Sequence, residues 1–148
     1  MEYVTLGKTG LKVSKIGLGG IPIQKIDAEG TRTLVHKLSD RGVNYIDTAR
    51  GYTVSEEYLG YALEGIRDKF VIATKSMART REAMAADIKK SLCNLKTDYI
   101  DIYQVHNPSM EQLDQVLAKD GALEAFAGGK EGRKDRTSGT DRPFRRSV

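Results

Sequence analysis

The sequence predicts an α/β fold in which parallel strands alternate with helices. Apolar segments suited to buried strands begin near residues 16, 43, 70 and 99, at nearly constant intervals. The stretches between them carry apolar residues at the three-to-four spacing of an amphipathic helix. The interval is also close to the size of one strand-plus-helix unit. Strands that alternate with helices in this way favour a parallel sheet.

The first element is expected to be a β-hairpin. Its turn is Gly7-Lys8-Thr9-Gly10, which lies between two short strand-like segments at residues 3–6 and 11–13. Four strands of the parallel sheet then follow, centred on Ile16–Gly19, Val43–Ile46, Phe70–Ala73 and Tyr99–Tyr103.

A helix is expected after each of these strands. The second opens at Ser55, a good N-cap residue, with Glu56 and Glu57 in a first turn where the helix dipole favours negative charge. The fourth opens with a capping box formed by Ser109 and Gln112. The apolar stripes are Leu34, Val35 and Leu38; Leu59, Ala62, Leu63 and Ile66; Met84, Ile88 and Leu92; and Leu113, Val116 and Leu117.

This pattern divides the chain into a folded part, residues 1–126, and a polar tail, residues 127–148. The tail holds seven Lys/Arg and three Asp/Glu, and only three apolar residues. Such a composition predicts disorder, with a basic arm for an acidic partner as the alternative. The abrupt change of composition also suggests a hypothesis that residues 126–148 are out-of-frame sequence. The native gene would then encode a longer protein.

Composition excludes several classes of function. The net charge of +4 comes entirely from the tail, because residues 1–126 hold 17 charges of each sign, so nucleic-acid binding is not expected. No apolar run is long enough for a membrane span, and the N-terminus has no signal-peptide pattern. The single cysteine, Cys93, excludes a disulfide or a multi-cysteine metal site within the chain. We therefore expect a cytoplasmic protein without a metal.

Four polar residues lie at or just after the ends of successive predicted strands. Asp47 closes the second strand, Tyr52 lies in the loop behind it, Lys75 closes the third strand and His106 closes the fourth. The carboxyl ends of parallel strands meet at one edge, so these side chains are expected to converge. A buried Asp–Lys pair or a strand-end histidine alone is more often structural. Four such residues at successive strand ends favour a functional site.

The set has a coherent chemical use. A tyrosine hydroxyl can protonate a carbonyl oxygen, although the ordinary pKa of the phenol is about 10. A nearby ammonium group favours the phenolate, and a carboxylate paired with that ammonium keeps it charged and in place. A histidine can orient the carbonyl group.

Two other oxidoreductase classes do not fit. The segment Gly17-Leu18-Gly19-Gly20-Ile21-Pro22 has proline at the third glycine position of the dinucleotide-binding fingerprint. The Tyr-x-x-x-Lys pair of short-chain dehydrogenases occurs at none of the seven tyrosines. The glycines are interpreted as close-packing positions at a strand end.

Residues 1 to about 125 resemble the aldo-keto reductase family. The resemblance rests on the stretch from Gly42 to Gly60, on Ala73-Thr74-Lys75 and on residues 100–106, Ile-Asp-Ile-Tyr-Gln-Val-His. The opening residues 6–13 and 17–20 also resemble the family's hairpin and first strand. The similarity is greatest to a subgroup with an Asp-Thr-Ala-Arg-Gly-Tyr-Thr stretch. One departure is Thr53, which stands where glycine is usual.

The resemblance implies a TIM-type (β/α)8 barrel, of which this chain holds the hairpin and about four strand–helix units. It implies NADP(H) as cofactor and the reversible reduction of an aldehyde or ketone, with Tyr52 as proton donor. It places Asp47, Tyr52, Lys75 and His106 on the catalytic tetrad, and Gly19, Gly20, Ile21 and Asp47 near the cofactor. The alternative hypothesis is an inactive half-barrel that associates with a partner or closes as a homodimer, because an open sheet exposes its edges and its inner face.

Overall fold

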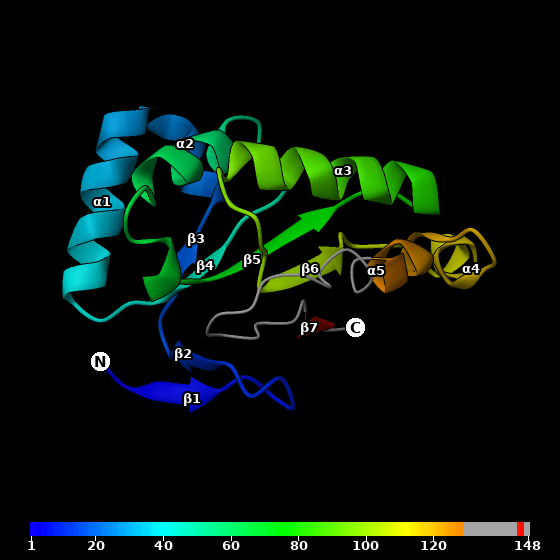
Figure 1. Ribbon diagram of the computed structural model, residues 1–148, viewed down its shortest axis with the longest axis horizontal. Coiled ribbons are helices and arrows are strands. Elements are labelled where there is room, and N and C mark those ends of the chain that lie inside the picture. Colours follow the sequence, from blue (N-terminus) through cyan, green and yellow to red (C-terminus); the bar gives the residue numbers. More distant parts are fainter. Residues whose placement is uncertain (129–144, 147–148) are drawn as a thin grey trace, which may run out of the picture.

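The computed structural model describes residues 1–128 and 145–146, and the chain folds into a layered α/β arrangement (Figure 1). Helices α1 (Ala28–Asp40), α2 (Ser55–Ala62) and α3 (Arg81–Asn94) lie along one face of a parallel sheet. The strands of this sheet follow the order β3 (Leu18–Gly19), β4 (Tyr45–Asp47), β5 (Val71–Ser76), β6 (Ile102–Val105) and β7 (Arg145–Arg146). The predicted α/β class and parallel sheet are confirmed.

The N-terminal hairpin is a separate antiparallel unit next to the start of β3. It pairs β1 (Tyr3–Thr5) with β2 (Lys12–Ser14), and Gly7 and Gly10 in its turn have positive φ angles of 48° and 71°. Glycine suits these positions because it has no Cβ to clash in the left-handed region. Ser14 and Asn44 exchange two hydrogen bonds that attach the hairpin to the segment preceding β4.

The parallel strands begin later than the sequence predicted. The first strand covers only Leu18–Gly19, and Ile16 is exposed. The fourth begins at Ile102, because the preceding Asp101 serves as a junction instead of a ladder residue. Its carboxylate accepts hydrogen bonds from the Ile72 amide and from the guanidinium of Arg67.

The helices start at recognisable caps, with one correction. Asp27 caps α1, Thr80 caps α3, and the predicted Ser109–Gln112 capping box opens α4 (Met110–Leu117). The N-cap of α2, however, is Val54 and not Ser55. Short 3-10 turns lie at Ile21–Lys25, Arg67–Lys69 and Ala122–Glu124.

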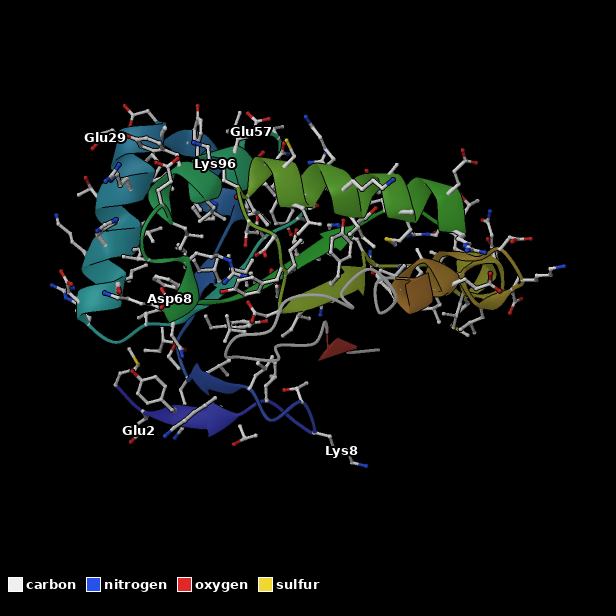
Figure 2. The ribbon with its side chains drawn as sticks, in the orientation of Figure 1. Glu2, Lys8, Glu29, Glu57, Asp68 and Lys96 are labelled. Atoms are coloured by element: carbon white, nitrogen blue, oxygen red, sulfur yellow. The ribbon has the colours of Figure 1, made fainter. Side chains whose placement is uncertain are left out.

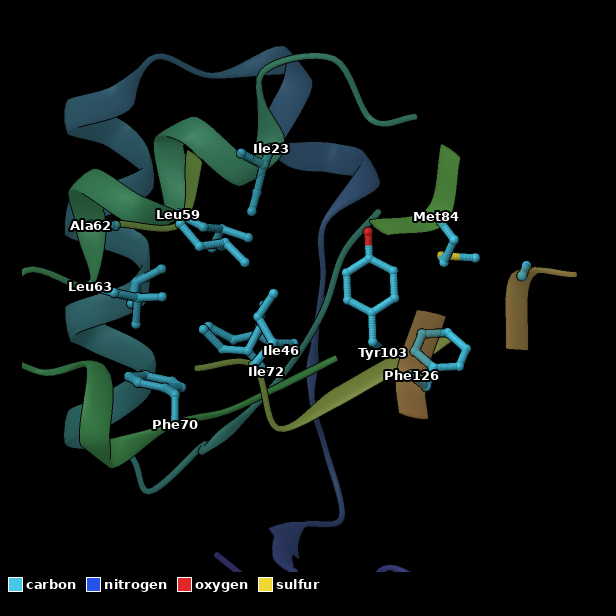
Figure 3. Close-up of a cluster of buried hydrophobic side chains, with 14 of the residues drawn as sticks. Ile23, Ile46, Leu59, Ala62, Leu63, Phe70, Ile72, Met84, Tyr103 and Phe126 are labelled. Carbon is cyan, nitrogen blue, oxygen red and sulfur yellow. The ribbon is translucent and has the colours of Figure 1, made fainter. Parts of the chain in front are cut away.

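The hydrophobic core lies between the sheet and its helical layer. Ile46 and Ile72 project from β4 and β5 toward Leu59 and Leu63, while Tyr103 of β6 packs near Phe126 (Figure 3). Alternate strand residues point to opposite faces of a sheet. The other face therefore presents half-buried side chains, among them Tyr45, Asp47, Val71, Lys75 and Gln104. A cavity of about 410 Å³ lies between this face and the hairpin.

Within the predicted tail, the structure describes four residues. Helix α5 (Ala125–Gly128) continues through residues 127 and 128, and Arg145–Arg146 form the short strand β7, parallel to β6. The rest of that predicted tail, residues 129–144 and 147–148, lies outside the described residues. Within residues 1–128 and 145–146, no helix combines the length and apolar character needed to cross a membrane.

Candidate active site

The structure brings the four predicted site residues to one edge of the sheet. Asp47 is the last residue of β4, Lys75 lies near the end of β5, and His106 directly follows β6. Tyr52 lies in the loop between β4 and α2. The parallel register places Asp47 beside Ala73 and Lys75 beside Gln104, so the strand ends are nearly level.

Lys75 is at the centre of this group. Its Nζ donates to Asp47 Oδ1 at 2.5 Å and to the Thr48 carbonyl at 2.9 Å. The same Nζ lies 5.4 Å from the centroid of the Tyr52 ring. The Lys75 side chain is 13% exposed, so its charge acts in a partly desolvated site. One ammonium group thus contacts both the carboxylate and the tyrosine.

His106 completes the group and lies against the ring of Tyr52. The two rings meet edge to face, with centroids 5.9 Å apart and planes at 86°. The backbone of His106 is held at both ends: its N–H donates to Ser76 O at 2.8 Å, and its carbonyl accepts from Arg79 at 2.9 Å. Among the described residues, its buried Nδ1 has no hydrogen-bond partner.

The pKa of His106 is lowered from its ordinary value of 6.5. Burial is the main cause, the positive charges of Lys75 and Arg79 add to it, and Asp47 opposes it. The imidazole is therefore neutral at pH 7, with one nitrogen available as a hydrogen-bond donor. Because the pKa is lowered in the folded state, the stability tied to neutral His106 is complete above about pH 6.5 and is lost as the pH falls through the lowered pKa.

The predicted cofactor segment lies beside Asp47 at the end of β3. Gly19 pairs with Asp47 in the sheet register, and a Cβ on Gly19 would meet nothing within 4 Å. Gly20 differs, because its Cβ would lie 2.7 Å from the Thr48 hydroxyl. Ile21 is 55% exposed. Gly19 therefore leaves room for a cofactor to approach the backbone, whereas Gly20 is a close-packing position.

Ser55 takes a different role from the predicted helix cap. Its hydroxyl is buried, lies 2.9 Å from the Thr48 hydroxyl and donates to Gly20 O at 3.1 Å. Gly20 N in turn donates to Asp47 O at 2.7 Å. These contacts connect the cofactor segment, the end of β4 and the start of α2.

Glu56 has a role that was not predicted from the sequence. It was expected only as a first-turn carboxylate favoured by the helix dipole, yet it is 1% exposed. Its carboxylate accepts hydrogen bonds from Arg50 at 2.8 Å, Thr74 at 2.8 Å and Asn94 at 3.2 Å. A signal in the sequence was the polar pair Thr74 and Ser76 flanking Lys75, because these residues must face the helices and buried hydroxyls need partners.

Thr53 occupies a backbone conformation that suits glycine. Its φ angle is +41°, in the left-handed region, and its hydroxyl donates to Gln24 at 2.9 Å. A side chain in this region costs about 1–2 kcal/mol relative to the right-handed form. The backbone after Tyr52 therefore has the shape that the family's usual glycine would adopt easily.

Within residues 1–128 and 145–146, no group of three or more His, Cys, Asp or Glu side chains is placed to hold a metal ion. The polar groups that converge at this edge, an ammonium, a carboxylate, a phenol and a neutral imidazole, are suited to proton transfer to an oxygen atom.

Comparison with known proteins identifies the family. The model of the aldo/keto reductase family matches residues 15–127. The chain therefore belongs to the aldo/keto reductase family, an α/β-barrel family of oxidoreductases.

Curated relatives and solved structures agree with this assignment. The chain is 35% identical to aldo-keto reductase YhdN of Bacillus subtilis, over 73% of this chain and 38% of that protein. It is 32% identical to L-galactose dehydrogenase of Arabidopsis thaliana, over 80% of this chain and 42% of that protein. The holo form of an aldo-keto reductase from Bacillus halodurans superposes with a TM-score of 0.77 and 30% identity, covering 88% of this chain and 47% of that one.

An aldo-keto reductase from Klebsiella pneumoniae in complex with NADPH superposes with a TM-score of 0.72 and 28% identity, over 86% of this chain and 44% of that one. The chain spans about two fifths of the length of the curated relatives named above. Its own structure is thus a parallel-stranded part of the family's barrel.

Proposed function

We propose that this chain carries the catalytic residues of an NADP(H)-dependent reductase of aldehydes or ketones. Asp47, Tyr52, Lys75 and His106 are its catalytic residues in this proposal. The observation that carries it is the position of Lys75 Nζ, which donates to Asp47 and lies 5.4 Å from the Tyr52 ring. This arrangement suits a tyrosine that gives up a proton.

Each side chain has a defined part in the proposed reaction. The Tyr52 hydroxyl gives its proton to the carbonyl oxygen, and the alcohol forms as the O–H bond to that oxygen is made. The Lys75 ammonium stabilises the phenolate that remains, and Asp47 keeps that ammonium charged and oriented. Neutral His106 donates a hydrogen bond to the carbonyl oxygen and orients it. When bound, the nicotinamide cofactor supplies the hydride for the carbonyl carbon.

The residues at the end of β3 fit a nicotinamide cofactor. Gly19 leaves open space where a side chain would stand, and Ile21 offers an exposed apolar surface beside it. The Asp47 side chain is 39% exposed next to them. We assign Gly19, Ile21 and Asp47 to the cofactor on this basis, and we assign Gly20, which packs against the Thr48 and Ser55 hydroxyls, to the support of this segment. The NADPH complex of the Klebsiella pneumoniae relative supports the choice of cofactor.

A kinetic comparison tests this proposal. NADPH consumption by the full chain is followed with a panel of aldehydes and ketones. Tyr52→Phe should lower kcat by about 10²–10⁴-fold, the usual contribution of a positioned acid. Tyr61→Phe is the matched control, because its hydroxyl donates to Glu29 on the exposed outer side of the helical layer. Equal rates for the wild type and Tyr52→Phe would refute the assigned role.

The second candidate function is that of a self-associating half-barrel without activity. The observation in its favour is the cavity of about 410 Å³ between the hairpin and the open face of the sheet, lined in part by Val4, Leu6, Val13 and Leu18. Pairing of two copies would cover this apolar lining. Sedimentation with and without NADPH separates the two functions. A dimer that binds no cofactor supports the second function and contradicts the first, and a dimer that binds it supports both the site and its closure by a second copy.

A further inference from the structure

We propose that Arg50 is a positioning residue that holds the Tyr52 loop against the strand that carries Lys75. This inference rests on the proposed catalytic roles of Tyr52 and Lys75. Arg50 itself does not face the reacting group, since its side chain turns toward the helical layer, where it meets residues of α2 and α3.

The backbone of Arg50 is bonded directly to Lys75. Its N–H donates to the Lys75 carbonyl at 2.9 Å, which extends the pairing of β4 with β5 past the last strand residue, Asp47. Tyr52 follows two residues later, and its N–H donates to Ala49 O at 3.1 Å in a tight turn. The position of the Tyr52 ring over Lys75 therefore depends on where Arg50 is held.

The side chain of Arg50 lies between two carboxylates of the helical layer. Its Nη1 is 2.8 Å from Glu56 Oε2, and its Nε is 3.7 Å from Asp87 Oδ1. Thr74 donates to Glu56, and Ser76 donates to Asp87. The guanidinium thus joins the two helices that form these contacts.

Thr74 and Ser76 are the two neighbours of Lys75 on β5, and both are fully buried. Side chains alternate along a strand, so the Thr74 and Ser76 hydroxyls point toward the helices while Lys75 between them points toward the site. The two hydroxyls therefore hold β5 to the helices on either side of Lys75. The two carboxylates that receive these hydroxyls are the same two that contact Arg50. The Arg50 guanidinium therefore connects the Tyr52 loop to the same two carboxylates that hold β5.

The contacts with Glu56 and Asp87 suit arginine at position 50 better than lysine. A guanidinium presents several donors in a rigid plane and can contact two carboxylates at once, whereas a lysine ammonium is a compact point charge. The Arg50 side chain is 22% exposed and Glu56 is 1% exposed, so both charges are largely removed from water. Losing the guanidinium would leave the Glu56 carboxylate buried without its counter-charge, which favours movement of the loop.

Nuclear magnetic resonance of the full chain tests the inference without any need for turnover. The variants are Arg50→Met and the milder Arg50→Lys, and Arg41→Met is the control because Arg41 is exposed. Three quantities are measured: cross-peaks between the Tyr52 and His106 rings, hydrogen exchange of the residue-50 amide, and the pKa of His106. Gly42→Ala serves as a destabilised reference, because Gly42 has a φ angle of +79°, contacts Met1 and Tyr3 and lies at the opposite end of β4 from the Tyr52 loop.

For Arg50→Met we expect loss of the ring cross-peaks and about fivefold to tenfold faster amide exchange, as follows from losing one hydrogen bond. The pKa of His106 should rise toward its ordinary value, because departure of the Tyr52 ring exposes the imidazole while Lys75, Arg79 and Asp47 remain. Arg50→Lys should show the same changes to a smaller extent. If Arg50→Met does not fold, Arg50→Lys decides by the same three readouts.

The inference is overturned if the Arg50 variants lose stability yet keep the cross-peaks, exchange rate and His106 pKa of the wild type, as Gly42→Ala should. A separate NADPH titration of the wild type reports on the proposed function. Absence of binding would contradict that function and leave the positioning result intact, so the two failures are distinguishable.

Discussion

Glu56 offers the sharpest test of the buried network, because a matched carboxylate stands next to it. Glu56 and Glu57 occupy the same first turn of α2. Glu56 points inward and accepts three hydrogen bonds, whereas Glu57 points away from the core on the outer side of the helical layer (Figure 2). We consider Glu56→Gln, Glu56→Leu and Glu57→Gln.

The expected losses follow from the contacts. Glutamine at position 56 can still accept from Arg50 and donate to the Thr74 hydroxyl, so Glu56→Gln mainly converts a charge-assisted hydrogen bond into a neutral one, at a cost of about 1–2 kcal/mol. Leucine removes every acceptor and leaves the Arg50 charge in a desolvated position without Glu56. Breaking a buried pair in this way costs about 3–5 kcal/mol. Glu57→Gln removes only a helix-dipole interaction of about 0.5 kcal/mol.

Urea unfolding measures the three free energies, and the slope of each transition checks that the surface exposed on unfolding is unchanged. The free energy of unfolding of native proteins is about 5–15 kcal/mol, so the loss expected for Glu56→Leu would be a large fraction of it. The reasoning would be refuted if Glu56→Leu cost less than about 1 kcal/mol, or no more than Glu57→Gln.

Three further predictions concern other parts of the chain. Gly60→Ala should destabilise the fold by about 3 kcal/mol in urea unfolding, because its Cβ would lie 2.1 Å from a backbone oxygen at the end of α3. Gly51→Ala, whose Cβ meets nothing within 4 Å, should change stability by less than about 0.5 kcal/mol, and equal effects would contradict this account. Arg79→Met should raise the pKa of His106, since the Arg79 charge lowers it. A nuclear magnetic resonance titration that finds no rise would contradict this electrostatic effect of Arg79. Ser109→Ala should cost about 1 kcal/mol of unfolding free energy by removing the capping box of α4, and an unchanged urea midpoint would count against it.

Periodicity and strand-end position were enough to predict most of the fold and the convergence of the residues in the candidate site. The interval between apolar segments predicted the parallel sheet, and the rule that parallel strands end at one edge brought Asp47, Lys75 and His106 together. The contact of Lys75 with both Asp47 and Tyr52 follows from this register. The sequence alone could not provide the distances.

The orientation of side chains next to the site was harder to predict. Ser55 and Glu56 look like an ordinary helix start, because their residue types are the preferred ones there. In the structure both turn inward, where Thr48, Gly20, Arg50 and Thr74 offer partners from three other segments. Gly20 and Thr74 are distant in sequence, so local propensity carries no information about them.

The cofactor segment shows a similar limit. The sequence favoured close packing for the adjacent glycines at the end of β3, and the family resemblance offered cofactor approach as the alternative. The structure separates them, since a Cβ would clash at Gly20 and would meet open space at Gly19. The difference arises from the Thr48 and Ser55 hydroxyls, which pack against Gly20 alone.

The central claim is that these residues form a working nicotinamide cofactor and carbonyl site, and an NADPH titration followed by nicotinamide fluorescence tests it most directly. We predict saturable binding by the purified full chain in about the micromolar range, which is common for enzyme ligands. Lys75→Met should weaken this binding if the Lys75 charge reaches the nicotinamide end. No binding by the wild type up to about 1 mM NADPH would contradict the claim.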